Sequence, residues 1–364
     1  MLKNPFKFGS IVDDPYFTNR TAEIAQVTSV LNSSNHLILI SPRRFGKSSL
    51  IYKVIDRLNR PIIAIDLQLI TSYEDFSAQL LKRIYRIFPA ARIKQFIRNF
   101  RILPTISLNP VTNEVDISFQ PSAQGFTMLD DVLDLIDKLS SEKKRVIVVM
   151  DEFQEIKRFG VDLVRQMRSV IQHHQHINYV FLGSQESMIS DIFEKKKSPF
   201  YHFGFLLRLN KINRNDFKNY LESGFQLQKE KAAISEEILE FTKCHPYYTQ
   251  QLAFMVWEIL SNTPDSINSI TLAVDEIIRI HDMDYERLWL TFNNTDKKLL
   301  IGMAESGLTP LSEAFYRKYE LGAPSTVFSS LKRIMINGYI TKLAGKYEID
   351  DPFFRRWIAE RRNL

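Results

Sequence analysis

The chain contains one cysteine, Cys244, among its 364 residues, so no intrachain disulfide can form. It also has no apolar run that approaches the roughly 20 residues needed to cross a bilayer. Residues 1–8 lack the apolar core of a secretion signal. These absences lead us to expect a cytoplasmic protein that is not inserted in a membrane.

The sequence has no low-complexity tract of the kind that stays disordered. Apolar residues make up 45% and charged residues 25%, the composition of a soluble globular protein. A chain of 364 residues is too long for one core of ordinary size, which predicts two or three domains. The net charge of +6 is compatible with an acidic partner but does not require one.

Three histidines lie close together at positions 173, 174 and 176. No acid or thiol accompanies them at the spacing of a metal site. We therefore interpret them as a solvated helix end.

The segment Ser41-Pro-Arg-Arg-Phe-Gly-Lys-Ser48 has the spacing of a phosphate-binding loop but lacks the usual first glycine. Residues 36–40 before it predict a buried strand, and residues 49–58 after it predict a helix. In that order, backbone N–H groups of the loop and helix point at a phosphate. Lys47 would add positive charge, and the Ser48 hydroxyl would bind Mg²⁺. The tripeptide Gly46-Lys47-Ser48 alone is weak evidence for such a loop, because a Gly-Lys-Ser/Thr sequence occurs by chance on the order of 0.2 times in a chain of this length.

A second segment, Arg145-Val-Ile-Val-Val-Met-Asp-Glu152, supplies an independent half of a nucleotide site. Its five apolar residues predict an inner parallel strand whose carboxyl end reaches a ligand. Asp151 suits holding Mg²⁺ through its water shell, and Glu152 suits orienting or deprotonating a water. Taken alone, the two acids could equally be a solvated strand end. Together with the first segment they predict a P-loop nucleotide site.

Residues 178–184 form a third apolar run that ends in a small polar residue, Ser184. In P-loop ATPases, the strand beside the acidic strand carries a residue that senses the γ-phosphate, and Ser184 is the candidate. The alternative is a serine cap on a helix that starts near Glu186. Both roles stay open.

The remaining patterns predict an α/β fold: a P-loop NTPase parallel sheet with helices on both faces, followed by a helical lid and a winged-helix domain. We place the P-loop domain at residues 1–209, with a hairpin insertion at about 101–120. The lid covers 210–292 and the winged helix covers 293–364. The aromatic-rich residues 4–20 are expected to pack over the edge of the sheet, with contact to an adenine as the alternative. In the lid, Pro246 suits the first turn of a helix and His245 suits its cap.

Two regions are candidates for DNA contact. Residues 82–101 hold seven basic residues, no acid and four interleaved aromatics, which suits phosphate contact with stacking. We favour the alternative of amphipathic helices whose aromatics face the core. The third helix of the winged-helix domain and its wing carry polar and basic residues, namely Ser325, Thr326, Ser329, Lys332, Arg333, Lys342 and Lys346. A winged helix also serves as a protein-interaction module, so both uses stay open.

The chain resembles the AAA+/STAND-type P-loop ATPases of the archaeal-ATPase group, which also occur in bacteria. The resemblance covers nearly the whole length. It rests on Phe17-Thr-Asn-Arg20, the segments 41–50 and 148–154, Phe181-Leu-Gly-Ser184, Ser198-Pro-Phe-Tyr201, His245-Pro-Tyr-Tyr248 and the C-terminal segment 347–357. It implies ATP/ADP and Mg²⁺ as cofactors, slow hydrolysis used as a switch, and a His245 that faces the nucleotide. The residues expected to hold the nucleotide are Ser41, Pro42, Arg43, Arg44, Phe45, Gly46, Lys47, Ser48, Ser49 and His245.

The chain departs from the family at two points. Ser41 replaces the first glycine of the loop, which bears on the rate of turnover. Many relatives carry an arginine after the Ser-Pro-x-Tyr segment, where this chain has His202-Phe203-Gly204. Arg168 is then the candidate for an arginine that stabilises the transferred phosphate, and if it acts between subunits hydrolysis needs a homo-oligomer.

Two main functions remain, and a third possibility is a degenerate P-loop that serves only as a scaffold for protein partners. The first is an ATPase whose hydrolysis of ATP moves the lid and winged helix, with a protein client that the sequence does not identify. The second is a DNA-binding regulatory, defence or mobile-element protein in which the nucleotide is mainly structural. No Asn-Lys-x-Asp run typical of guanine recognition is present, which favours ATP.

Overall fold

The computed structural model describes residues 3–108, 115–120, 125–263, 268–343 and 345–362. By its contacts the chain divides into two compact units. One, which we call the sheet unit, contains Arg20–Ser41 and Lys47–Leu209. The other, which we call the helical unit, contains the chain up to Asn19, the short stretch Pro42–Gly46, and the chain from Asn210 on. The division into three domains stays a prediction.

The sheet unit is built on a five-stranded parallel sheet with the strand order β2-β5-β6-β1-β7. The strands are β1 Leu37–Ile40, β2 Ile62–Asp66, β5 Val146–Asp151, β6 Ile177–Gly183 and β7 Phe205–Arg208. β1 lies between β6 and β7, and its last residue, Ile40, is in register with Gly183 and Arg208. The three apolar runs therefore predicted β1, β5 and β6 correctly, and the predicted parallel sheet is confirmed.

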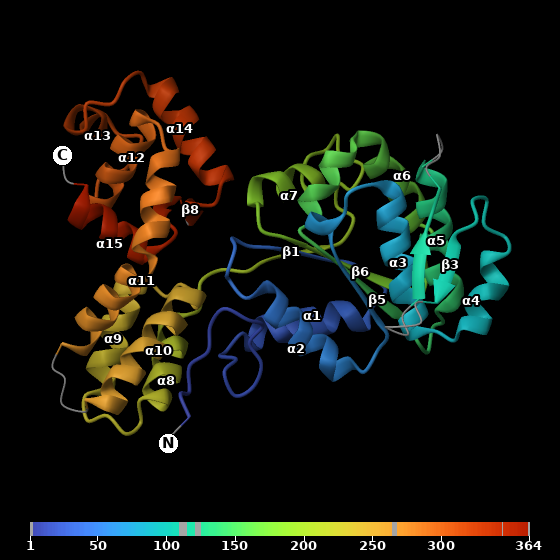
Figure 1. The fold of residues 1–364 in the computed structure, drawn as a ribbon, viewed down its shortest axis with the longest axis horizontal. Helices are drawn as coiled ribbons and strands as arrows, with labels where there is room; N and C mark the ends of the chain where they lie inside the picture. The colour runs from blue at the N-terminus through green and yellow to red at the C-terminus, as the bar shows by residue number, and fades with distance from the viewer. Residues whose placement is uncertain (1–2, 109–114, 121–124, 264–267, 344, 363–364) are drawn as a thin grey trace. The chain divides into compact units, whose positions relative to one another are not determined.

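Helices cover both faces of this sheet, as predicted (Figure 1). They are α1 Thr21–Asn32, α2 Lys47–Leu58, α3 Tyr73–Ile87, α4 Ala90–Ile97, α5 Gly125–Leu139, α6 Val161–Ile171 and α7 Glu186–Phe193, with 3₁₀ turns η1 Leu67–Leu69 and η2 Phe153–Phe159. Ile38 and Ile40 share one buried core with residues of α3, α5 and α6. Leu37 and Leu39 point to the other face, because side chains alternate along a strand, and α1 and α2 pack there.

The predicted insertion is a two-stranded antiparallel hairpin, β3 Thr105–Leu108 and β4 Val115–Ser118. The expected turn at residues 109–113 lies outside the described residues. β4 packs beside α3, and Lys82 of α3 forms an ion pair with Asp116 of β4 at 3.3 Å. The hairpin thus extends the side of the sheet unit on which α3 lies.

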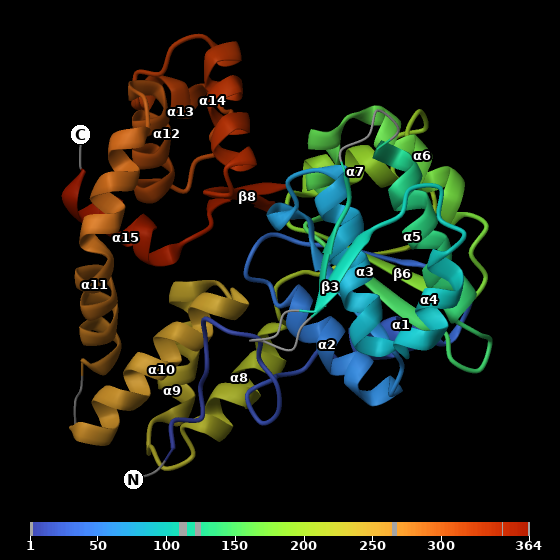
Figure 2. The ribbon, with the colours of Figure 1, turned by 45° about the vertical axis from the view of Figure 1, so that its right-hand side comes forward.

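The helical unit has one continuous core, to which residues of the lid helices and residues of the winged helix contribute. The lid helices are α8 Arg214–Gly224, α9 Lys231–Thr242, α10 Pro246–Asn262 and α11 Ser269–Thr291. In Figure 2 the 23-residue α11 extends from the lid helices to α15 of the winged helix. Near its end, the ring of Tyr285 packs at a tilt and that of Trp289 packs edge-on against Trp357 of α15, so the lid and the winged helix share their aromatic core.

The winged-helix region follows the predicted order of three helices and a wing. Its elements are α12 Asn294–Glu305, α13 Glu313–Lys318, α14 Pro324–Ile336, β8 Ile340–Leu343, β9 Lys346–Ile349 and α15 Pro352–Arg361. A reciprocal cap between Asn293 and Asp296 starts α12. The sequence patterns did not predict the last helix, α15. Asp351 caps its N-terminus by accepting hydrogen bonds from the N–H groups of Phe353 and Phe354.

Two packing predictions were wrong. The N-terminal aromatics were expected over the edge of the sheet, but Phe6 is buried among lid residues, with its ring centroid 4.9 Å from that of Phe225. His174 was expected in solvent, but its side chain is only 4% exposed and pairs with Asp134 at 3.1 Å. Its second ring nitrogen lies 2.8 Å from the hydroxyl of Tyr179. Both errors concern partners that are distant in sequence.

Across the parts of the chain that the structure describes, no helix is both long and apolar enough to span a bilayer.

We predict that Phe6→Ala lowers the free energy of unfolding of the helical unit by about 3–5 kcal/mol, because it leaves a cavity between the lid helices. Urea unfolding followed by tryptophan fluorescence measures this unit alone, since Trp257, Trp289 and Trp357 all lie in it. Phe328→Ala is the matched control, because Phe328 is 54% exposed and should change stability by less than about 0.5 kcal/mol. Equal effects of the two substitutions would contradict the packing of the N-terminal segment.

Candidate nucleotide site

The carboxyl ends of β1, β5 and β6 bring the predicted site residues of the sheet unit to one edge. Ser41 follows β1, and its N–H donates to the carbonyl of Gly183 at 3.2 Å. Lys47 begins α2 and is buried, with Nζ donating to the Ser41 carbonyl at 3.1 Å. A buried ammonium at the first turn of a helix matches the chemistry of a bound anion.

Ser48 and Asp151 face each other at this edge, as the predicted magnesium ligands should. The Ser48 hydroxyl lies 3.5 Å from Oδ2 of Asp151. Burial raises the pKa of Asp151, and the nearby carboxylates of Glu152 and Asp66 add to this, whereas Lys47 opposes it. A carboxylate that lacks a full set of cationic partners is suited to receive a metal ion.

Glu152 occupies the left-handed backbone region, with φ of 49° and ψ of 46°. This conformation is rare for glutamate and typical of functional sites. Its carboxylate accepts a hydrogen bond from the Ser184 hydroxyl at 2.6 Å and another from the Gln154 side chain. The predicted general base is therefore fixed by two neutral donors.

Ser184 does not cap the following helix. The N-cap of α7 is Gln185, and no side-chain hydrogen bond is made there. Of the two roles left open for Ser184, the cap was wrong, and the hydroxyl instead contacts Glu152.

Gln154 is a site residue that the sequence reasoning did not assign. Its side chain is fully buried, and its position two residues after Glu152 was the available signal. A Cβ on Gly183 would lie 2.1 Å from Ile189 and 3.0 Å from Oε1 of Gln154. The end of β6 therefore needs a glycine to make room for α7 and Gln154.

The stretch Pro42–Gly46 of the loop belongs to the helical unit. The Arg44 guanidinium stacks on Tyr247 of α10 at 4.5 Å and donates to the Tyr248 hydroxyl at 3.1 Å. Phe45 is buried, with its ring edge-on to His245 at 4.8 Å. Arg44 and Gly46 both have positive φ, of 64° and 87°. Successive N–H groups in a loop of this kind converge on an anion.

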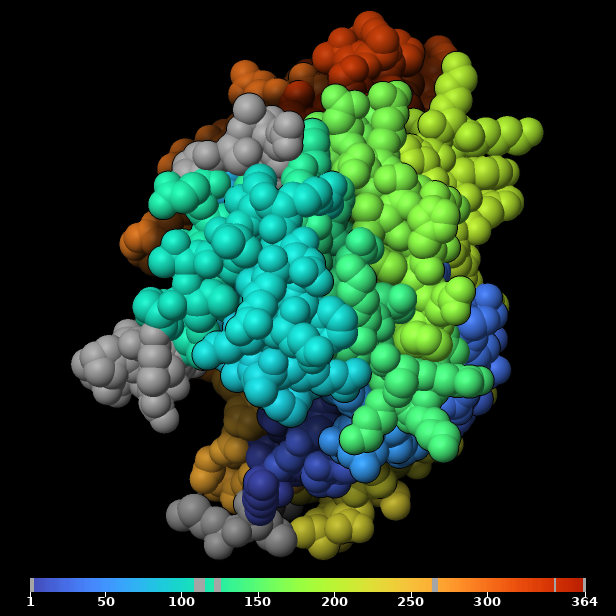
Figure 3. Space-filling model, turned by 90° about the vertical axis from the view of Figure 1, so that its right-hand side faces the viewer, coloured from blue at the N-terminus to red at the C-terminus, as the bar shows by residue number. Residues whose placement is uncertain are grey.

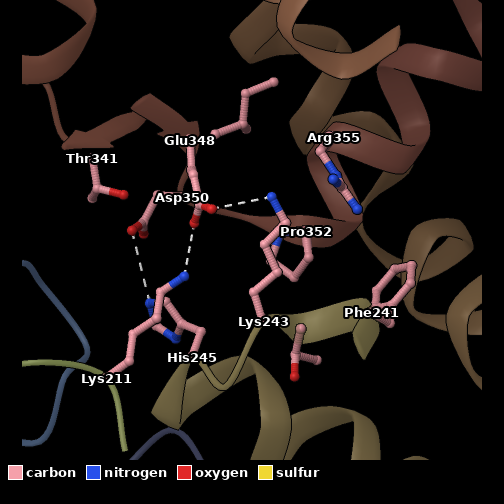
Figure 4. A pocket seen from close by; sticks show the side chains of 11 residues that line it. Lys211, Phe241, Lys243, His245, Thr341, Glu348, Asp350, Pro352 and Arg355 are labelled. Atoms are coloured by element: carbon pink, nitrogen blue, oxygen red, sulfur yellow. Dashed lines mark hydrogen bonds and ion pairs between the residues drawn. The ribbon is translucent and has the colours of Figure 1, made fainter. Parts of the chain in front are cut away.

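His245 caps α10 as predicted, because Nδ1 accepts a hydrogen bond from the Tyr248 N–H and Pro246 occupies the first turn. Its other nitrogen, Nε2, lies 3.8 Å from Oδ1 of Asp350, which follows the wing strand β9 (Figure 4). Among the described residues neither of these two atoms has a hydrogen-bond partner. Burial lowers the pKa of His245 well below its ordinary value, with Lys211 and Arg44 adding to the effect.

Asp350 lies in a cluster of charges between the lid and the wing. Glu348 of β9 pairs with Lys211 at 2.7 Å and with Lys243 at 3.2 Å (Figure 4). The cluster encloses a cavity of about 20 Å³, enough for one water molecule. The wing is thus tied to the lid residues that flank His245.

Arg168, the candidate for phosphate stabilisation, lies away from this edge of the sheet. Its guanidinium stacks on Phe203 at 4.3 Å and donates to Gln172. Burial lowers the pKa of His36, which precedes β1, and the charges of Arg145 and then Arg168 lower it further. His36 and Phe203 lie before strands β1 and β7, so Arg168 is at the amino edge of the sheet. Within one chain it does not reach Glu152, which leaves only the intersubunit role as a prediction.

The basic stretch 82–101 lies on α3, α4 and the residues that follow, coloured cyan in Figure 3. Its aromatics Tyr85, Phe88, Phe96 and Phe100 are partly buried against the core of the sheet unit. Arg101 pairs with Asp131 at 2.8 Å. Rings that pack against the core expose little of their faces for stacking on bases, so the structure agrees with the amphipathic interpretation.

On the winged helix, Ser325, Thr326, Ser329 and Lys332 of α14 are exposed, as are Lys342 and Lys346 of the wing. Arg333 differs, because it forms an ion pair at 2.5 Å with the buried Asp296 of α12. It therefore holds α14 against α12, although its side chain is still 48% exposed.

The strand order, the Lys-Ser start of α2 and the Asp-Glu end of β5 define a P-loop ATPase fold with a C-terminal winged helix. Residues 17–252 match the model of a family described as an ATPase domain predominantly from Archaea. The chain belongs to this family. Residues 283–360 match a probable winged helix domain.

Solved structures agree in fold. The Walker-type ATPase PABY2304 of Pyrococcus abyssi is 17% identical, with a TM-score of 0.68 over 97% of this chain and 99% of that one. The ORC2 protein of Aeropyrum pernix, in ADPNP-ADP complexes, is 14% identical, with a TM-score of 0.57 over 98% and 96%. The ORC1 protein of Aeropyrum pernix, in complex with DNA, is 12% identical, with a TM-score of 0.51 over 96% and 95%. No curated protein matches the chain.

We predict a pH-dependent effect of Asp350→Asn. Burial raises the pKa of Asp350 from 3.8 to about 7, and the negative charges of Asp351 and Glu348 add to this rise. The positive charges of Arg44 and Lys211 oppose it. The neutral acid thus stabilises the native state fully below about pH 4, and this contribution is lost as the pH rises through 7. The asparagine stays neutral, so its Tm relative to wild type should increase by on the order of 3 °C between pH 5 and pH 8.

Thermal unfolding of both proteins at the two pH values measures this difference. Asp284→Asn, at an exposed aspartate of the same unit, is the control and should give a constant difference. A Tm difference for Asp350→Asn that stays constant or falls with pH would show that the carboxylate is already compensated by its neighbours.

Proposed function

We propose that this chain binds ATP with Mg²⁺ at the carboxyl edge of its sheet and hydrolyses it to ADP and phosphate. The observation that carries the proposal is the placement of the Glu152 carboxylate. It is held by Ser184 and Gln154 directly beside the pair formed by Ser48 and Asp151. A general base in a site of this kind must be held where it can reach the attacking water, next to the groups that hold the phosphate and the metal.

The residues at this edge fit both cofactors. Lys47 and the first N–H groups of α2 would hold the phosphates. The Ser48 hydroxyl and the Asp151 carboxylate are oxygen donors, the type that Mg²⁺ prefers. When bound, Mg²⁺ neutralises the charge that develops on the phosphate oxygens.

Glu152 would orient the attacking water and accept its proton. The neutral donors Ser184 and Gln154 keep its carboxylate in place. Because Ser184 follows the strand between β1 and β5, it is also suited to respond to the presence of the γ-phosphate.

We further propose that hydrolysis acts as a switch on the helical unit. Arg44 and Phe45 of the phosphate loop contact Tyr248 and His245 of α10. His245 in turn faces Asp350 at the end of the wing. A change in the loop on loss of the γ-phosphate would therefore alter contacts that hold the wing against the lid.

We predict that Lys47→Ala and Glu152→Gln separate binding from chemistry. Lys47→Ala removes the phosphate-facing charge and should abolish ATP binding. Glu152→Gln keeps the shape of the side chain but not its basicity, so ATP should bind normally while turnover falls by about 10²–10⁴-fold. Calorimetric titration of ATP with Mg²⁺ and a phosphate-release assay measure the two steps.

Glu155→Gln is the matched control, because Glu155 lies on the adjoining 3₁₀ turn and pairs with Arg158 outside the site. Its turnover should equal that of wild type. Normal hydrolysis by Glu152→Gln would eliminate Glu152 as the base, and failure of the wild-type protein to bind ATP would eliminate the proposal.

DNA binding through the winged helix is the second candidate function. Lys332 on α14 and Lys342 and Lys346 on the wing are exposed, and phosphate contact would use these charges. The similarity of fold to the ORC1 protein, whose structure is in complex with DNA, motivates the test.

We predict that Lys332→Glu combined with Lys342→Glu weakens duplex DNA binding by at least about tenfold at low salt and reduces its salt dependence. Fluorescence anisotropy with a labelled duplex, repeated between about 50 and 200 mM salt, measures both quantities. Lys231→Glu, an exposed lysine on α9, should leave binding unchanged. No binding by the wild-type protein at the lowest salt would remove this candidate.

A further inference from the structure

The long helix α11, whose backbone is drawn in Figure 2, carries a stripe of exposed apolar side chains. Leu272, Ile280, Met283 and Leu290 are 50%, 57%, 68% and 74% exposed. At 100° per residue these four side chains fall within about 80° of one another on the helix. The opposite side of α11 is buried in the core of the helical unit through residues such as Ile277 and Trp289.

Charged residues of opposite sign divide this stripe. Glu276 lies between Leu272 and Ile280, and Arg287 lies between Met283 and Leu290. Read along α11, the stripe is apolar, acidic, apolar, apolar, basic and apolar. Reversing the direction of the helix gives the same apolar pattern with the two charges exchanged.

We propose that α11 is an interface between two copies of this chain, paired antiparallel about a two-fold axis near residues 281–282. In this arrangement Ile280 and Met283 of the two copies meet at the centre. Leu272 of one copy lies near Leu290 of the other at each end, and Glu276 lies opposite Arg287. Each contact occurs twice, as a two-fold interface requires.

The order of the two charges favours a second copy of the chain as the partner and an antiparallel arrangement of the two helices. A parallel pair of the same helices would place Glu276 beside Glu276 and Arg287 beside Arg287, which is unfavourable. A nucleic acid would need a predominantly basic surface, whereas this stripe has an acid for each base. Glu276 already forms an ion pair with Arg279 at 2.6 Å, and Arg287 forms one with Asp284 at 3.8 Å. Exposed pairs of this kind contribute too little to prevent a new partner from approaching.

The length of the stripe determines how tightly we expect the two copies to bind. From Leu272 to Leu290 the helix extends about 27 Å at 1.5 Å per residue. A single pair of helices of this length buries an area at the low end of specific interfaces. We therefore expect a dimer that dissociates in the micromolar range.

A charge-exchange experiment tests the antiparallel pairing on the full-length chain. Sedimentation equilibrium should show a monomer–dimer equilibrium for wild type. Glu276→Arg and Arg287→Glu should each raise the dissociation constant by at least about tenfold, because each places like charges opposite one another. The double variant Glu276→Arg/Arg287→Glu should restore dimerisation to within about threefold of wild type.

Glu313→Arg is the matched control, since Glu313 is an exposed acid on α13 that pairs with Arg317 in the same helical unit. It should not change the dissociation constant. Circular dichroism of each variant separates loss of folding from loss of dimer. A monomeric wild type at all concentrations, or a double variant no better than the single ones, would overturn the proposal, and neither result bears on the assignment of Glu152 as the general base.

Discussion

The parallel register of β1, β5 and β6 is the constraint on which the rest of the site depends. Because the three strands run in the same direction and end at the same edge, Ser48, Asp151 and Ser184 meet there although they are far apart in sequence. β6 lies between the other two strands, so Ser184 reaches Glu152 directly. A shift of one residue in β6 would turn Ser184 to the other face and leave Glu152 with Gln154 alone.

The sheet and the first half of the site were predictable because their signals are local. Apolar runs followed by Lys47-Ser48 or by Asp151-Glu152 specify both a buried strand and the chemistry at its end. The roles of Gln154 and Asp350 were not predictable in this way. Gln154 reaches Glu152 only because Glu152 adopts a left-handed conformation, and Asp350 meets His245 only through the fold of the helical unit.

The errors have the same origin. An aromatic segment such as residues 4–20 must be buried somewhere, but its composition does not say which surface receives it, and here lid helices do so through Phe225 and Tyr220. Arg168 looked available as a cation because it lies on the helix before β6. Its stacking on Phe203 depends on the return of the chain before β7, which no local pattern records.

The path of the chain between the two units has a mechanical consequence. The backbone passes from one unit to the other at residues 19/20, 41/42, 46/47 and 209/210, so two of the four crossings fall inside the phosphate loop. Any displacement of one unit against the other must then be taken up by backbone torsions at these crossings. Gly46, with φ of 87°, stands at one of them, and there a torsional change costs a glycine little. A change of backbone torsion in the proposed phosphate loop would therefore act on the same short segment that connects the two units.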